Sequence, residues 1–94
     1  MNITEVRVYP VEEERLKAYA TITFDDCFVV RNLKVIQGNS GLFVAMPSKR
    51  RKDGTYVDTA HPLNNETRRM IEGRVLERYW TELNKMRGEA AEGH

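Results

Sequence analysis

Four consecutive cationic side chains are the clearest chemical feature of the sequence: Lys49, Arg50, Arg51 and Lys52. Pro47 precedes them and Gly54 follows, so we expect the run to lie on a turn that projects its charges into solvent. Such a loop can neutralise several phosphates of a nucleic acid. A charged hairpin tip can also protect a sheet edge from aggregation, and the local sequence alone favours the two interpretations equally.

A second basic group lies where the sequence predicts the start of a helix. Arg68 and Arg69 occupy early turns, where the helix macrodipole favours acidic side chains, and Arg74 and Arg78 are like charges four residues apart. These small costs indicate an anionic partner. For Arg74 and Arg78 we favour the alternative that glutamates pair with them on a solvated helix face, the candidates being Glu66, Glu77 and Glu82.

Tyr56 is the aromatic side chain nearest to the basic run. An aromatic ring beside cationic side chains can stack on an unpaired base, as in proteins that bind single strands. We favour the commoner alternative, a strand tyrosine half-buried by its sheet.

Charge is unevenly distributed along the 94 residues, although the formal net charge is only +1. Residues 47–87 carry ten basic and six acidic side chains, whereas residues 1–46 carry five basic and six acidic ones. An anionic partner experiences this local field rather than the net charge, so the middle and helical segments are the place to look for a site.

The sequence does not contain the sets of residues that catalytic sites need. The glycine-containing segment 38–41 is not followed by the Gly-Lys-Ser/Thr of a phosphate-binding loop, and adjacent Asp25 and Asp26 point apart on a turn. His61 stands alone at a predicted corner, and the single cysteine, Cys27, cannot close an internal disulfide. We therefore expect no enzyme activity, no cofactor and no metal site, and a nucleic-acid hydrolase is the least favoured class.

Alternation of apolar and polar residues predicts antiparallel strands over residues 5–8 and 16–24. A third strand is predicted over residues 28–36, where the apolar phase slips near residues 31–32. A β-bulge explains this slip, and so does burial of both strand faces in a dimer. The sequence leaves both explanations open.

Turn residues at 37–41 predict a tight connection into a fourth strand over residues 42–46. Pro47 cannot occupy a central strand, and Asp53-Gly54 is a hairpin signal after which residues 56–59 return as a short fifth strand. The basic run thus lies near the tip of a hairpin.

A helix is predicted from a cap at Asn64 or Asn65 to about Met86. Its apolar side chains fall within one arc and should pack on the sheet: Ile71, Val75, Leu76, Tyr79, Leu83 and Met86. Glu72 lies within the same arc and contradicts a purely apolar stripe. We predict one domain over residues 1–87 and a flexible tail over residues 88–94.

No apolar run approaches the roughly 20 residues of a membrane helix, and the opening residues lack the apolar stretch of a secretory signal. We therefore expect a cytoplasmic protein that is free to associate with the nucleoid.

The segment 41–50, Gly-Leu-Phe-Val-Ala-Met-Pro-Ser-Lys-Arg, resembles the SpoVG family, together with Asp53-Gly54 and Ala60-His61-Pro62. The resemblance extends to Thr4-Glu5-Val6-Arg7 and covers about residues 1–83. It implies a small sheet with a C-terminal helix, a homodimer, and DNA binding, with RNA binding in some members. It also implies a regulatory role connected with sporulation and septation.

The resemblance also implies where a nucleic acid is bound. The basic segment after the Pro-Ser pair and the helical region carry over to Lys49, Arg50 and Arg68. Arg51-Lys52 stand where many relatives have Thr-Pro, which enlarges the positive loop.

Together these observations predict an α+β fold, with an antiparallel sheet of about five strands, one long C-terminal helix packed on it, and a homodimer. The predicted function is non-catalytic nucleic-acid binding (DNA, and RNA as an option) in a regulatory protein, with self as the only protein partner predicted. The predicted contacts are Lys49, Arg50, Arg51, Lys52, Arg68, Arg69 and Arg74. The alternative is a protein-interaction module in septation that binds no nucleic acid.

Overall fold

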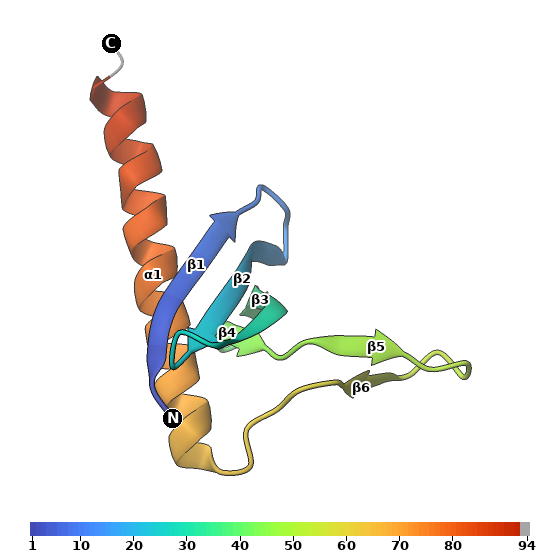
Figure 1. Ribbon diagram of the computed structural model, residues 1–94. Coiled ribbons are helices and arrows are strands. Elements are labelled where there is room, and N and C mark those ends of the chain that lie inside the picture. The colour runs from blue at the N-terminus through green and yellow to red at the C-terminus, as the bar shows by residue number, and fades with distance from the viewer. Residues whose placement is uncertain (93–94) are drawn as a thin grey trace.

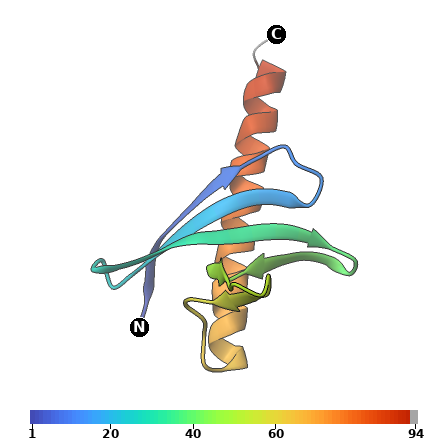
Figure 2. The same cartoon turned by 90° about the vertical axis from the view of Figure 1, so that its right-hand side faces the viewer.

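A computed structural model describes residues 1–92 of the chain. Its main sheet is an antiparallel meander of four strands in sequence order: β1 (Ile3–Pro10), β2 (Leu16–Phe24), β3 (Phe28–Gly38) and β4 (Gly41–Ala45). One long helix, α1 (Asn65–Glu92), crosses one face of this sheet (Figures 1 and 2). The α+β class and the C-terminal helix on an antiparallel sheet are confirmed.

The core lies between the sheet and the helix. Alternate residues of β1 and β2 are buried, as the period of two predicts, and Ala18 and Ala20 have almost no exposed surface. The buried apolar side chains are Ile3, Val6, Val8, Ala18, Ala20, Ile22, Phe24, Leu33, Val35, Val44, Met46, Ile71, Val75 and Tyr79. Every one comes from the main sheet, from Met46 directly after β4, or from α1. The segment between Met46 and α1 therefore contributes no side chain to this core.

A β-bulge in β3 accounts for the slip in its apolar phase. Ala20 pairs with Leu33 and Ile22 pairs with Val30, so two residues of β3 lie opposite one residue of β2. Asn32, inside the bulge, has a φ of 66°, a left-handed conformation that asparagine tolerates better than most residues. The structure therefore contains the bulge, one of the two explanations that the sequence left open.

The predicted fifth strand is not part of the main sheet. Two short strands, β5 (Ser48–Arg50) and β6 (Tyr56–Asp58), pair only with each other and form a separate two-stranded ribbon, which we call the arm. Figure 1 shows the arm projecting away from the sheet and the helix. The prediction of one sheet with about five strands was wrong because β5 is exposed throughout and offers no apolar face for the core.

Asn64 caps the N-terminus of α1. Its side-chain Oδ1 accepts a hydrogen bond from the Thr67 backbone N–H at 2.7 Å, which selects Asn64 over Asn65 as the cap. The helix continues to Glu92 rather than ending near Met86, and Met86 is 46% exposed. Much of the segment expected to be a flexible tail is thus helical, and positions 93 and 94 lie outside the described residues.

Within residues 1–92, no helix combines the length and the apolar composition required to cross a bilayer.

Candidate nucleic-acid interface

The register of the arm determines which side chains share a face. Arg50 pairs with Tyr56, and Lys49 pairs with Val57, in an antiparallel ladder. Because side chains alternate between faces along a strand, Arg50 and Tyr56 project to one side of the arm and Lys49 projects to the other. Cationic side chains therefore border both faces of the ribbon.

A hydrogen-bonded turn orders the tip of the arm. The Arg51 N–H donates to the Thr55 carbonyl at 2.7 Å, and the Gly54 N–H donates to the Arg51 carbonyl at 3.0 Å. Asp53 Oδ1 accepts from both the hydroxyl of Thr55, at 2.6 Å, and its backbone N–H, at 3.0 Å. Gly54 has a φ of 89°, which suits glycine at this position. These bonds order the turn that contains Arg51 and Lys52, directly after Arg50 at the end of β5.

The carboxylate of Asp53 is engaged by the turn itself. The hydrogen bond from the Thr55 hydroxyl, and next the one from its N–H, hold the pKa of Asp53 below its ordinary value. Asp-Gly-Thr is a sequence that commonly closes such a turn, so the role of Thr55 was within reach of sequence reasoning that considered side-chain bonding.

All four cations of the basic run are exposed: Lys49, Arg50, Arg51 and Lys52. Within residues 1–92 none of their side chains forms an ion pair or a hydrogen bond. Their charges are therefore not neutralised inside the chain, and they are available to an anionic ligand at little desolvation cost.

Hydrogen bonds join the two ends of the arm at its base. The backbone N–H and the hydroxyl of Thr59 both donate to the Pro47 carbonyl, at 2.7 and 3.1 Å, and Pro47 is buried. His61, beyond this point, has its Nδ1 at 3.0 Å from the Pro62 carbonyl. These contacts fix where the arm leaves the domain.

The predicted helix contacts do not join the arm within one copy of the chain. Arg69 is exposed and Arg68 is partly buried at the start of α1, while the arm tip lies well apart from this end of the helix in Figure 1. One chain therefore presents two separate basic regions.

Arg74 and Arg78 both have partners inside the chain. Arg78 Nη2 lies 2.8 Å from Glu82 Oε1, as the favoured pairing alternative predicts, and Lys85 approaches the same carboxylate at 3.8 Å. Arg74 Nη1 donates instead to the Ile3 carbonyl, at 3.4 Å. Arg74 thus ties the helix to β1, and of the seven predicted contacts it has the most evident structural role.

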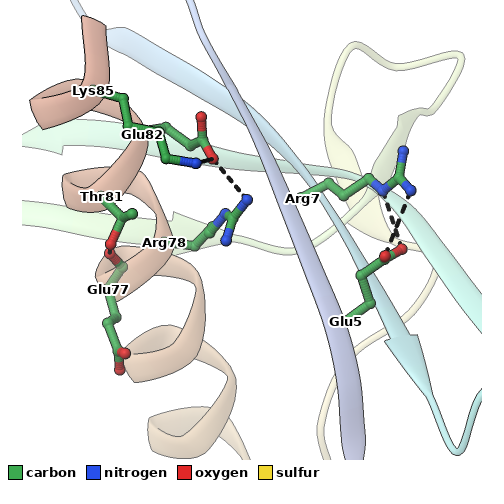
Figure 3. A network of polar contacts seen from close by, with 7 residues as sticks. All are labelled: Glu5, Arg7, Glu77, Arg78, Thr81, Glu82 and Lys85. Carbon is green, nitrogen blue, oxygen red and sulfur yellow. Dashed lines mark hydrogen bonds and ion pairs between the residues drawn. The ribbon is translucent and has the colours of Figure 1, made fainter.

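Arg74 and Arg78 belong to a polar groove of about 640 Å³ between β1 and α1. On the β1 side, Arg7 Nε lies 3.0 Å from Glu5 Oε1, and this hydrogen bond is the main reason that the pKa of Arg7 is raised (Figure 3). Acidic and basic side chains alternate here, so the groove lacks the uniform positive charge of the arm.

Tyr56 is 69% exposed, which contradicts the favoured expectation of a half-buried strand tyrosine. The expectation assumed a sheet beneath the ring, but the arm has no such layer. Sequence reasoning missed this because a strand pattern reveals pairing and not what covers each face.

The sequence comparisons match most of the chain. The family described as SpoVG matches residues 1–81, which include the whole sheet, the arm and the first half of the helix. A protein from an Anaeromyxobacter species is 69% identical over 85 residues, which are 90% of this chain and 88% of that protein. A protein from Bdellovibrio bacteriovorus is 67% identical over 86 residues, which are 92% of this chain and 80% of that protein. A protein from Agathobacter rectalis is 49% identical over 87 residues, which are 92% of this chain and 100% of that protein. All three are named "Putative septation protein SpoVG". The match across the sheet, the arm and the start of the helix shows that this chain belongs to the SpoVG family.

Proposed function

We propose that this chain is a non-catalytic regulatory protein that binds nucleic acid through its arm. DNA is the proposed ligand, and RNA is a second one. One observation carries the proposal: four exposed cations, which have no ion pair or hydrogen bond within residues 1–92, lie on a hydrogen-bonded hairpin that projects from the domain. A loop of this kind meets a phosphate backbone with its geometry already defined, so little ordering entropy opposes binding.

The proposed mechanism is neutralisation of phosphates, with release of the counterions that surround the nucleic acid. Arginine can in addition read guanine edges in a major groove. The regulated processes that we propose are sporulation and septation; membership of the SpoVG family and the name of its members, septation protein, support this proposal.

We further propose that the protein acts as a homodimer. Phe28 is 63% exposed and lines an apolar hollow of about 190 Å³ together with Met46 and Pro62. A second copy would remove this surface from water and would present a second arm to the same nucleic acid.

The test measures binding of duplex DNA and of RNA over a series of salt concentrations. Replacing Lys49, Arg50, Arg51 and Lys52 by alanine should weaken binding at least tenfold and reduce the dependence of log K on log salt. A matched control replaces four exposed cations outside the arm: Arg15, Arg31, Lys85 and Arg87. The arm assignment fails if both variants lose the same affinity, or if the arm variant loses none.

The alternative function is a protein-interaction module in septation, which the name of the relatives favours. Its arm would bind an acidic protein surface. It predicts that a protein partner is captured by the intact arm and that no salt-dependent nucleic-acid binding occurs.

A further inference from the structure

Tyr56 exposes an aromatic ring that serves no core. It is the first residue of β6, it is 69% exposed, and β5 and β6 contact no other strand or helix in the described part of the chain. A ring in this position gains little from burial within its own chain. An explanation for it must therefore come from something that binds the arm.

The neighbour of Tyr56 across the ladder is Arg50. Directly paired residues of an antiparallel ribbon have Cβ atoms about 4.5–5.5 Å apart and project to the same face. One face of the arm thus carries a guanidinium beside an aromatic ring. A guanidinium binds phosphate and a ring stacks on a base, so the pair matches the two ends of one nucleotide.

This chemistry selects among nucleic acids. In a duplex each base is already stacked on its neighbours, and its flat faces are not accessible to a protein ring. In a single strand, a loop or a bulge they are accessible. The exposed ring beside Arg50 therefore favours an unpaired nucleotide over a paired one.

We propose that Tyr56 stacks on an unpaired base while Arg50 holds an adjacent phosphate, so that the arm binds single-stranded segments of DNA or RNA. This inference rests on the proposed function and adds to it the class of nucleic acid and the residue that recognises it. The hydroxyl of Tyr56 is not required, because the face of the ring makes the contact.

The test compares two labelled oligonucleotides of equal length and charge by fluorescence anisotropy: oligothymidylate, and the same sugar-phosphate chain without bases. The natural chain should bind the strand with bases about tenfold more tightly than the strand without them. Tyr56→Leu should remove this difference and leave binding of the base-free strand unchanged. Tyr56→Phe should keep it. Oligouridylate in place of oligothymidylate tells whether RNA is bound in the same way.

The possible results separate failure of the stacking inference from failure of the proposed function. If the natural chain binds both strands equally, or if Tyr56→Leu keeps the difference, the stacking inference is overturned while the proposed function stands. If neither strand nor a duplex binds, the proposed function itself has failed. If Tyr56→Leu instead lowers the molecular mass in size-exclusion chromatography with light scattering, the ring belongs to a protein contact and the inference is again overturned. Circular dichroism should show no change, since Tyr56 lies outside the core.

Discussion

The carboxylate of Glu72, on the helix, accepts a hydrogen bond from the backbone N–H of Val44, at 3.3 Å. Val44 belongs to β4, an edge strand, and it alternates with residues that bond β3, so its N–H points away from the sheet. Glu72 satisfies this donor. The acidic residue that interrupts the apolar arc of the helix therefore occupies its position because it closes one sheet edge.

Glu72→Ala should lower the free energy of unfolding by about 1 kcal/mol, because it leaves the Val44 N–H without its charged acceptor. Urea denaturation followed by circular dichroism measures this. The control is Glu77→Ala, an exposed glutamate whose carboxylate has no hydrogen bond within the described residues and which undergoes the same change in helix propensity. Equal losses in the two variants would show that the edge contact does not stabilise the fold.

Asn32→Ala should destabilise the domain by about 1 kcal/mol, because alanine is strained at a φ of 66°. Asn32→Gly should have a much smaller effect, since glycine adopts this conformation without strain. Thermal unfolding of the two variants measures this difference in stability. The control is Arg31→Ala, a substitution at the exposed neighbouring residue. A glycine variant that is as unstable as the alanine variant would point to a lost side-chain contact rather than to backbone strain.

The turn of the arm should loosen in acid. A carboxyl group whose pKa is lowered in the folded state contributes stability above its unfolded pKa and loses it as the pH falls through the folded value. The pKa of Asp53 lies below its ordinary 3.8, so the Thr55 amide resonance should shift as the pH is lowered below that value.

Asp53→Asn should abolish this pH dependence of the Thr55 resonance. The main sheet provides an internal reference, because its amides should not follow the same titration. A Thr55 resonance that titrates unchanged in Asp53→Asn would show that another group controls the turn.

The proposed homodimer should have about twice the 10.9 kDa mass of one chain in light scattering. Phe28→Asp should shift the mass towards that of the monomer, because it places a charge at an apolar contact. Tyr9→Asp introduces the same charge at another exposed aromatic residue and should have no such effect. A natural chain that is monomeric at the highest concentrations tested would remove the dimer from the proposal.

Local patterns predicted the elements well. The strands β1 to β4 follow from alternation and turn residues, and the helix start follows from its asparagine cap. The same patterns failed where the answer depends on a distant segment. The Asp53-Gly54 signal indicated a hairpin with a returning strand at β6, but the strand β5 over Ser48–Arg50 was not predicted. The signal also contains no information about which sheet the hairpin would join.

Part of the candidate site was predictable because it depends on local sequence. The charge of residues 49–52 and their place near a hairpin tip are local properties, and the structure places them there. The exposure of Tyr56, the hydrogen bond of Arg74 to the Ile3 carbonyl and the edge contact of Glu72 involve segments that meet only in three dimensions. Whether the seven predicted residues bind a nucleic acid stays a prediction.

The isolation of the arm from the core bears on how this family can change. Among the described helices and strands, β5 and β6 contact only each other, and none of their residues belongs to the buried core. Substitutions there should therefore have little effect on the stability of the domain. If the basic run binds a ligand as proposed, selection on it would act on ligand affinity alone. Under the proposed function, changes at Arg51 and Lys52 would alter which ligands are recognised while the main sheet and α1 stay unchanged.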